Sequence, residues 1–118
     1  MTYEITIEGT PHTWNAFIGN RTNWRYFQYK KVTQTMVVAT LAPLRDKKWP
    51  LPRVRVTFCC GYPTKRRSDI DSLALKPHVD ALVLAGVITD DNKDVVREVR
   101  VTWEKSKEPY TKILITTL

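Results

Sequence analysis

Apolar and polar residues alternate in four stretches of the chain. Between residues 3 and 9 an apolar side chain occupies every second position, which predicts a strand with one buried face. The same period of two recurs over 53–60 and, less evenly, over 95–105 and 111–118. The sequence therefore predicts four strands, with the segment 106–110 as a hairpin-like connection between the last two.

A helical pattern separates the first two strands. Over residues 23–41 apolar side chains recur at spacings of three and four, and Asn23 fits an N-cap position. The side chains expected on the buried face of this helix are Phe27, Val32, Met36, Val37 and Leu41. A Pro-rich, charged loop is expected over 42–52.

A second helical pattern covers residues 72–86. Pro77 suits the first turn of a helix, so the regular helix is expected to begin near Lys76 and to end at Gly86. Its expected apolar face consists of Leu75, Val79, Leu82 and Val83. His78 falls in the first turn and is expected to be exposed.

The order strand, helix, strand, helix, strand, strand indicates an α/β (α+β) fold. With 118 residues, the chain has the size of one domain, and we expect a single compact unit over 1–118, with about four strands in a mixed sheet and two main helices packed on it. No apolar run approaches the roughly 20 residues that span a bilayer. The first residues look like a strand and not like a signal peptide, so we expect a cytoplasmic protein.

The two cysteines, Cys59 and Cys60, are adjacent in an apolar run. Neighbouring cysteines do not easily form a regular disulfide, and no Cys/His spacing suggests zinc. Both are therefore expected to be buried strand residues.

The whole chain carries a net charge of +7, and its positive charge is concentrated in one part. Residues 21–67 contain 12 Lys or Arg and one acid, Asp46, whereas residues 68–98 contain seven acids and three bases. Solubility accounts for some of this charge, but its segregation favours a surface that attracts a polyanion.

Acidic residues flank the second helix. Asp69 and Asp71 lie two residues apart, so in an extended segment both side chains project the same way. A strand–helix–strand crossover would return Asp90 or Asp91 alongside them. Converging carboxylates repel one another, and a hard divalent cation such as Mg²⁺ or Mn²⁺ removes that conflict. Helix capping and turn formation explain the same residues without a metal, and spacing alone leaves both readings open.

Two further charged features each have a structural and a functional interpretation. Lys76 and Asp80 are four apart and can form a surface ion pair, or the lysine can stabilise negative charge in a transition state. Residues 20–31 interleave bases, including Arg21 and Arg25, with four aromatic residues. Such bases bind phosphates and such aromatics stack on unpaired bases, although about half of these aromatics, Phe27 among them, are expected in the core.

Several of these residues occur in the same order in a known family. The segment 65–96 resembles the RusA-type Holliday junction resolvases, a family of crossover junction endodeoxyribonucleases with many phage-encoded members. The shared elements are a basic run, an Asp-x-Asp pair, a lysine, Asp-Ala-Leu, a glycine and an Asp-Asp pair. In this chain they are Lys65, Arg66 and Arg67, then Asp69 and Asp71, Lys76, Asp80 to Leu82, Gly86, and Asp90 with Asp91.

The resemblance implies a homodimeric endonuclease that depends on Mg²⁺, with Mn²⁺ as a substitute, and that cuts four-way DNA junctions in recombination and repair. It implies that Asp69, Asp71 and Asp91 bind the metal and act in catalysis, with Lys76 as the catalytic lysine. It places the protein in the cytoplasm of a bacterium or of a phage-infected host. The DNA-binding residues that we expect are Lys65, Arg66, Arg67, Arg21 and Arg25.

The chain departs from the family pattern at two positions. Ser72 replaces the usual Asn, and both residue types cap helices. The interval from Asp71 to Lys76 is one residue longer than in the best-known spacing, and one residue turns a helix by about 100°. The family role of Lys76 therefore requires the residues just before it to be non-helical, as Pro77 permits. Two alternatives stay open: a non-catalytic module that binds branched DNA, and a nuclease that prefers flaps or single strands.

Overall fold

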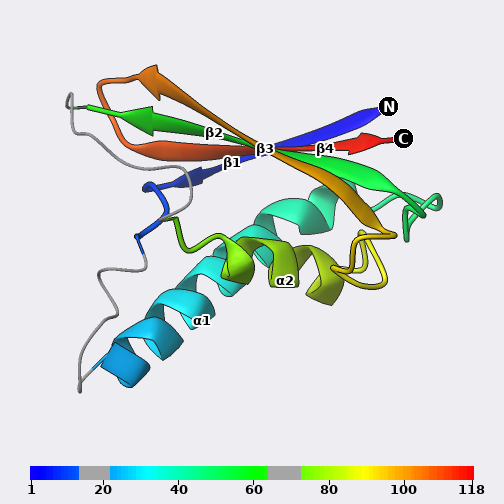
Figure 1. Ribbon diagram of the computed structural model, residues 1–118, viewed down its shortest axis with the longest axis horizontal. Coiled ribbons are helices and arrows are strands. Elements are labelled where there is room, and N and C mark those ends of the chain that lie inside the picture. The colour runs from blue at the N-terminus through cyan, green and yellow to red at the C-terminus, as the bar shows by residue number, and fades with distance from the viewer. Residues whose placement is uncertain (14–21, 64–72) are drawn as a thin grey trace.

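Four strands form one mixed sheet, and both helices lie on the same face of it (Figure 1). The computed structural model describes residues 1–13, 22–63 and 73–118. The elements, in chain order, are β1 (Thr2–Glu8), α1 (Thr22–Leu41), the 3-10 helix η2 (Ala42–Leu44), β2 (Val54–Tyr62), α2 (Lys76–Leu84), β3 (Val96–Lys105) and β4 (Tyr110–Thr117). The predicted α+β class and element order are confirmed. No helix in the described ranges is long and apolar enough to cross a membrane.

The strands are arranged in the order β1-β4-β2-β3. α2 connects β2 to β3, which pair in parallel, whereas β4 runs antiparallel to both β1 and β2. The predicted hairpin over 106–110 is therefore wrong, because this segment carries the chain past β2 instead of joining paired neighbours. The reason is burial: in the centre of the sheet, Ile113 and Ile115 are fully enclosed.

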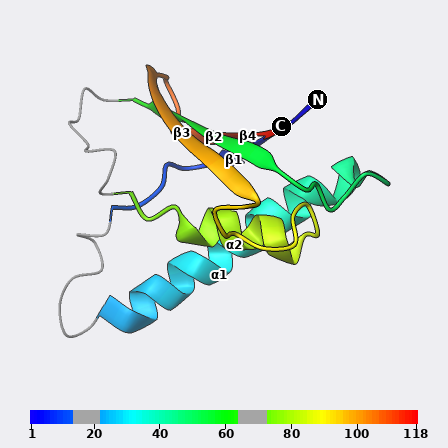
Figure 2. The same cartoon turned by 45° about the vertical axis from the view of Figure 1, so that its right-hand side comes forward.

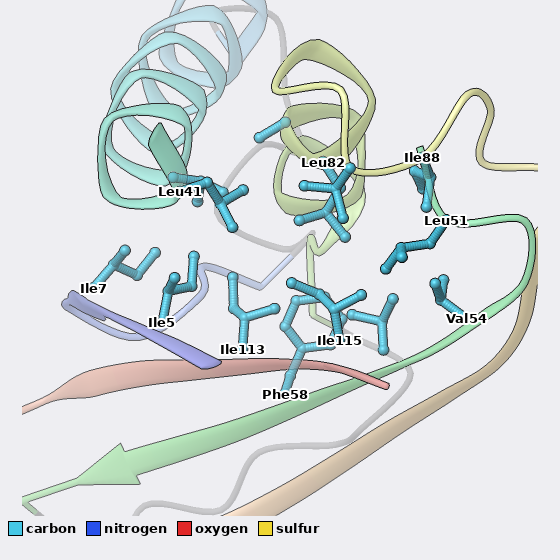
Figure 3. Close-up of a cluster of buried hydrophobic side chains, with 14 of the residues drawn as sticks. Ile5, Ile7, Leu41, Leu51, Val54, Phe58, Leu82, Ile88, Ile113 and Ile115 are labelled. Atoms are coloured by element: carbon cyan, nitrogen blue, oxygen red, sulfur yellow. The ribbon is translucent and has the colours of Figure 1, made fainter. Parts of the chain in front are cut away.

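The core lies between the sheet and the two helices (Figure 3). On β2, Val54, Val56 and Phe58 point into it and are fully buried, as the period of two predicts. Each such side chain contributes about 1.5–3 kcal/mol by leaving water. Of the adjacent cysteines only Cys60 is buried; Cys59 is half-buried, since successive strand residues face opposite ways.

The buried face of α1 differs from the prediction. Phe27 and Val32 are 65% and 59% exposed, whereas Val37 and Leu41 are fully buried and Thr33 lies beside them. At 100° per residue, Phe27 is about 120° round the helix from Thr33. The prediction was correct for Val37 and Leu41 but wrong for Phe27 and Val32, because a polar threonine occupies the core-facing stripe. The helix also begins at Thr22, so Asn23 lies within its first turn and does not precede it.

α2 begins at Lys76, as Pro77 predicts, with Leu75 as its N-cap and residues 73 and 74 outside the helix. His78 is only 2% exposed, so the expectation that it is solvent-facing was wrong. Its ring packs edge-on against Phe58, with centroids 5.7 Å apart, because the first turn of α2 lies directly over β2. Gly86 ends the segment with a φ of 81°.

Candidate active site

The Lys76 side chain joins α2 to the acidic turn, residues 90–94, that follows it. Its Nζ donates to Asp80 Oδ1 at 3.2 Å and to Asp91 Oδ2 at 3.3 Å. The contact with Asp80 is the expected i,i+4 pair, whereas Asp91 is 15 residues away in sequence. Lys76 occupies the positive end of the α2 dipole, where a cation is disfavoured, and the two carboxylates offset that cost.

A helix C-cap turns the chain so that the acidic turn returns beside α2 (Figure 2). The Gly86 N–H donates to Val83 O at 3.1 Å, and the Val87 N–H donates to Leu82 O at 3.0 Å. This pair of hydrogen bonds is a Schellman motif, which the positive φ of Gly86 makes possible. Val87 and Ile88 are then buried in the core, so the return path is anchored before the aspartates.

The acidic turn stabilises its own shape by side-chain hydrogen bonds. The Asp91 N–H donates to Asp90 Oδ1 at 2.7 Å, and Asn92 Nδ2 donates to Asp90 Oδ2 at 3.2 Å. Asn92 Oδ1 then accepts from the N–H of Asp94 at 2.9 Å. Turn formation is therefore part of what these residues do, and it leaves Asp91 facing Lys76.

The ion pairs change the acid–base properties of the site. Hydrogen bonds to Asp80 first and Asp91 second raise the pKa of Lys76. The hydrogen bond from Lys76 is the largest cause of a lowered pKa for Asp91, and Asp90 is the second. At neutral pH the site therefore holds a charged ammonium against a charged carboxylate.

A surface pocket of about 340 Å³ adjoins this cluster. α1 contributes Lys30 and Gln34 to its lining, and the acidic turn contributes Asp90 and Asp91. Sequence reasoning did not select Lys30 or Gln34 for this site. Their i,i+4 spacing puts them on one face of α1, but the face that meets α2 depends on helix packing.

The predicted site residues fall into two groups. Lys76 and Asp91 are in contact, and Arg25 lies elsewhere on α1, in a pocket of about 470 Å³ that His12 and Tyr29 also line. The remaining predicted residues lie outside the described ranges: Asp69, Asp71, Lys65, Arg66, Arg67 and Arg21.

Within residues 1–13, 22–63 and 73–118, no three His, Cys, Asp or Glu side chains are grouped to hold a metal ion. Asp91 is nevertheless an exposed carboxylate, the hard oxygen donor that Mg²⁺ prefers. It fits such an ion as one ligand, and the expected metal set is completed only by Asp69 and Asp71.

No protein-family model matches the chain, and no curated protein matches it in sequence.

Proposed function

We propose that this chain is a Mg²⁺-dependent endodeoxyribonuclease of the RusA type that resolves four-way DNA junctions. The observation that carries the proposal is the contact between Lys76 and Asp91. The resemblance to the RusA-type family assigns these two residues as the catalytic lysine and a metal-binding carboxylate. Residues 73 and 74 precede the N-cap Leu75 and support the same assignment, because an extra residue before the helix leaves the phase of α2 unchanged.

The roles follow from charge and exposure. Asp69, Asp71 and Asp91 would hold Mg²⁺, which supplies an activated water and neutralises the leaving oxygen. The Lys76 ammonium, 59% exposed, stabilises the negative charge that develops on the phosphate. The carboxylates of Asp80 and Asp91 keep that ammonium oriented toward the acidic turn before DNA binds.

DNA binding follows from the basic half of the chain. Lys65, Arg66, Arg67, Arg21 and Arg25 are proposed to contact backbone phosphates, which position a duplex without reading its sequence. Selection of a branched substrate then depends on shape.

The proposed active form is a homodimer, whose two sites match the two-fold symmetry of a four-way junction. We place the second subunit on a groove of about 730 Å³ between α1 and α2, to be called the α1/α2 groove. Its apolar lining residues are Phe27, Val38, Ala39 and Leu84. Phe27 and Leu84 are each 65% exposed, and apolar side chains gathered in this way favour a covering partner.

The test is cleavage of a synthetic four-way junction with and without Mg²⁺, by wild type and by the variants Asp71→Asn, Asp91→Asn and Asp94→Asn. Asp94 is the matched control, an exposed acid in the same turn. We expect Asp71→Asn and Asp91→Asn to cut at least about 10²-fold more slowly, and Asp94→Asn to match wild type. Equal cleavage by all four proteins would refute the assignment.

Linear, flap and single-stranded substrates run in parallel separate the alternatives. Faster cutting of flaps or single strands than of junctions would replace junction resolution by another nuclease activity. Tight junction binding with no incision in Mg²⁺ or Mn²⁺ would identify a non-catalytic module.

A further inference from the structure

Tyr29 of α1 places its hydroxyl between two segments that lie just before the candidate site. The hydroxyl donates to Ala74 O at 2.8 Å and accepts from the His12 N–H at 3.3 Å. The His12 ring stacks on the Tyr29 ring, with centroids 4.5 Å apart and planes 18° from parallel. One side chain of α1 therefore contacts both the segment after β1 and the segment before α2.

These two segments also pair with each other. The Ala74 N–H donates to His12 O at 2.8 Å, and Thr13 and Leu73 form an isolated antiparallel bridge. A single bridge of this kind is weak by itself, since even a whole two-stranded hairpin is marginal in water. The Tyr29 hydroxyl adds the third contact, so that α1, the segment 12–13 and the segment 73–74 are joined at one point.

The point where these three segments meet lies close to Lys76 in the chain. Ala74 is fully buried and precedes the first residue of α2 by two positions. Leu75, between them, accepts hydrogen bonds from the N–H groups of His78 and Val79 at 3.1 and 3.2 Å, so the segment continues into the first turn. Loss of the Tyr29 hydroxyl would remove a hydrogen bond to a buried residue two positions before Lys76, and a buried acceptor left without its donor costs free energy.

Tyr29 is suited to a permanent hydrogen bond. Burial raises the pKa of its phenol far above the ordinary value, so the hydroxyl stays protonated and keeps its donor at any pH used to assay a nuclease. Tyr29 does not line the pocket that Lys76 and Asp91 adjoin, within the described residues. Any effect on catalysis is therefore exerted through the residues that it holds.

We propose that Tyr29 is a positioning residue, whose hydroxyl fixes residues 73–75 and thereby sets where Lys76 meets the acidic turn. The segment that it fixes also follows Asp71 by two residues in sequence, so the same contact anchors the chain at the end of the proposed metal-binding stretch. The proposal that this matters for catalysis rests on the proposed function.

The experiment compares Tyr29→Phe with Tyr3→Phe. Tyr3 is a matched control, because its hydroxyl also makes one short hydrogen bond, to Asp46 Oδ2 at 2.7 Å, in a different part of the molecule. Single-turnover cleavage of a four-way junction gives the rate constant, and binding without metal gives Kd. We expect Tyr29→Phe to lower the rate about 10- to 100-fold with Kd unchanged within about twofold, because small misplacements of catalytic groups have effects of this size. Tyr3→Phe should leave both quantities at the wild-type values.

Amide hydrogen exchange of Ala74 supplies a readout that needs no activity. In Tyr29→Phe we expect this amide to exchange at least about 10-fold faster, while the amide of Val56 in the core keeps its protection. Unchanged exchange at Ala74 would overturn the proposal. Faster exchange with an unchanged cleavage rate, or an equal loss of rate in Tyr3→Phe, would overturn the catalytic part of it.

A wild-type protein that cuts no branched substrate would point instead to failure of the proposed function. In that case the exchange of Ala74, together with the NMR signal of the Lys76 ammonium in the two variants, still decides whether Tyr29 fixes the start of α2. A displaced Lys76 signal in Tyr29→Phe alone supports the positioning role, and identical signals refute it.

Discussion

Lys76 Nζ lies 3.3 Å from Asp91 Oδ2, although 15 residues separate the two in sequence. The contact joins the first residue of α2 to the turn that precedes β3. A surface ion pair of this kind contributes little to stability, and a lysine at a helix N-terminus opposes the helix dipole. The pair therefore adds little to folding, and the proposed function assigns it a chemical role.

Replacing Lys76 with Met tests that explanation. We expect the rate of junction cleavage to fall about 10²- to 10³-fold, because the developing phosphate charge loses its cation. Junction affinity should change by less than about threefold, since the remaining Lys and Arg residues still bind the backbone. Single-turnover cleavage and a metal-free binding titration measure the two quantities separately.

Asp80→Asn is the control for Lys76. This change removes the local i,i+4 partner at 3.2 Å but leaves the contact with Asp91, so we expect a rate within about fivefold of wild type. A loss as large as that of Lys76→Met would mean that Asp80, and not Asp91, is the essential partner of the lysine.

How much of this site could be predicted depends on the separation in sequence of the residues in each contact. The pair of Lys76 and Asp80 follows from helical spacing alone. A crossover was expected to return Asp90 or Asp91 toward Asp69 and Asp71, but the contact of Asp91 with Lys76 was not predicted, because it requires a C-cap at Gly86 and a buried return path. The places of Lys30 and Tyr29 were not predictable, since they depend on which face of α1 meets α2.

Gly86 controls the return path and can be tested by stability. Its φ of 81° is costly for residues with a Cβ, so Gly86→Ala should lower the free energy of unfolding by about 1–2 kcal/mol. Gly86→Asn should cost less, because Asn tolerates this conformation better. Among the described residues other than Gly86 and its two chain neighbours, no heavy atom lies within 4 Å of the added Cβ, so a clash does not confound the comparison. Urea unfolding checks both variants, and equal losses would show that backbone conformation is not the cause.

The α1/α2 groove is tested by oligomeric state. Phe27→Glu should convert a dimer to a monomer, because it places a charge in the apolar contact. Lys30 and Lys31 line the groove, so two copies bring like charges together and association should strengthen as salt rises. Sedimentation equilibrium at low and high salt measures both effects.

Val99→Glu provides the matched control for that experiment. Val99 is 51% exposed on β3, away from the groove, and its replacement should leave the dimer intact. A monomeric wild type, or equal dissociation by both variants, would remove the groove as the subunit contact.

The successes and failures of the fold prediction have one physical origin. The alternation of Val54, Val56 and Phe58 was sufficient because a strand sorts its residues by a period of two. The hydrophobic pattern was not sufficient to orient α1, because Thr33 takes a core position that such a pattern does not mark. The insertion of β4 between β1 and β2 depends on pairing between distant segments, which local patterns do not encode.

His78 combines burial with a titratable ring and predicts a pH dependence of stability. Burial lowers its pKa from 6.5 to about 4, and its Nδ1 has no hydrogen-bond partner in the described part of the chain. Between these two values the unfolded chain binds a proton that the folded protein does not, so stability falls as pH decreases through this window. The full loss is about 3 kcal/mol, of which about 2 kcal/mol should appear between pH 7 and pH 5.

His78→Leu should remove most of this dependence, because the leucine cannot titrate. The lowered pKa values of Asp46, Asp91 and Glu98 also make stability fall with acid, but they act mainly below about pH 5. Urea unfolding at pH 7, 6 and 5 should therefore give a steep decline for wild type and a shallow one for the variant. Parallel declines, or an NMR titration in which the His78 ring protonates near pH 6.5, would show that the buried imidazole is not the cause.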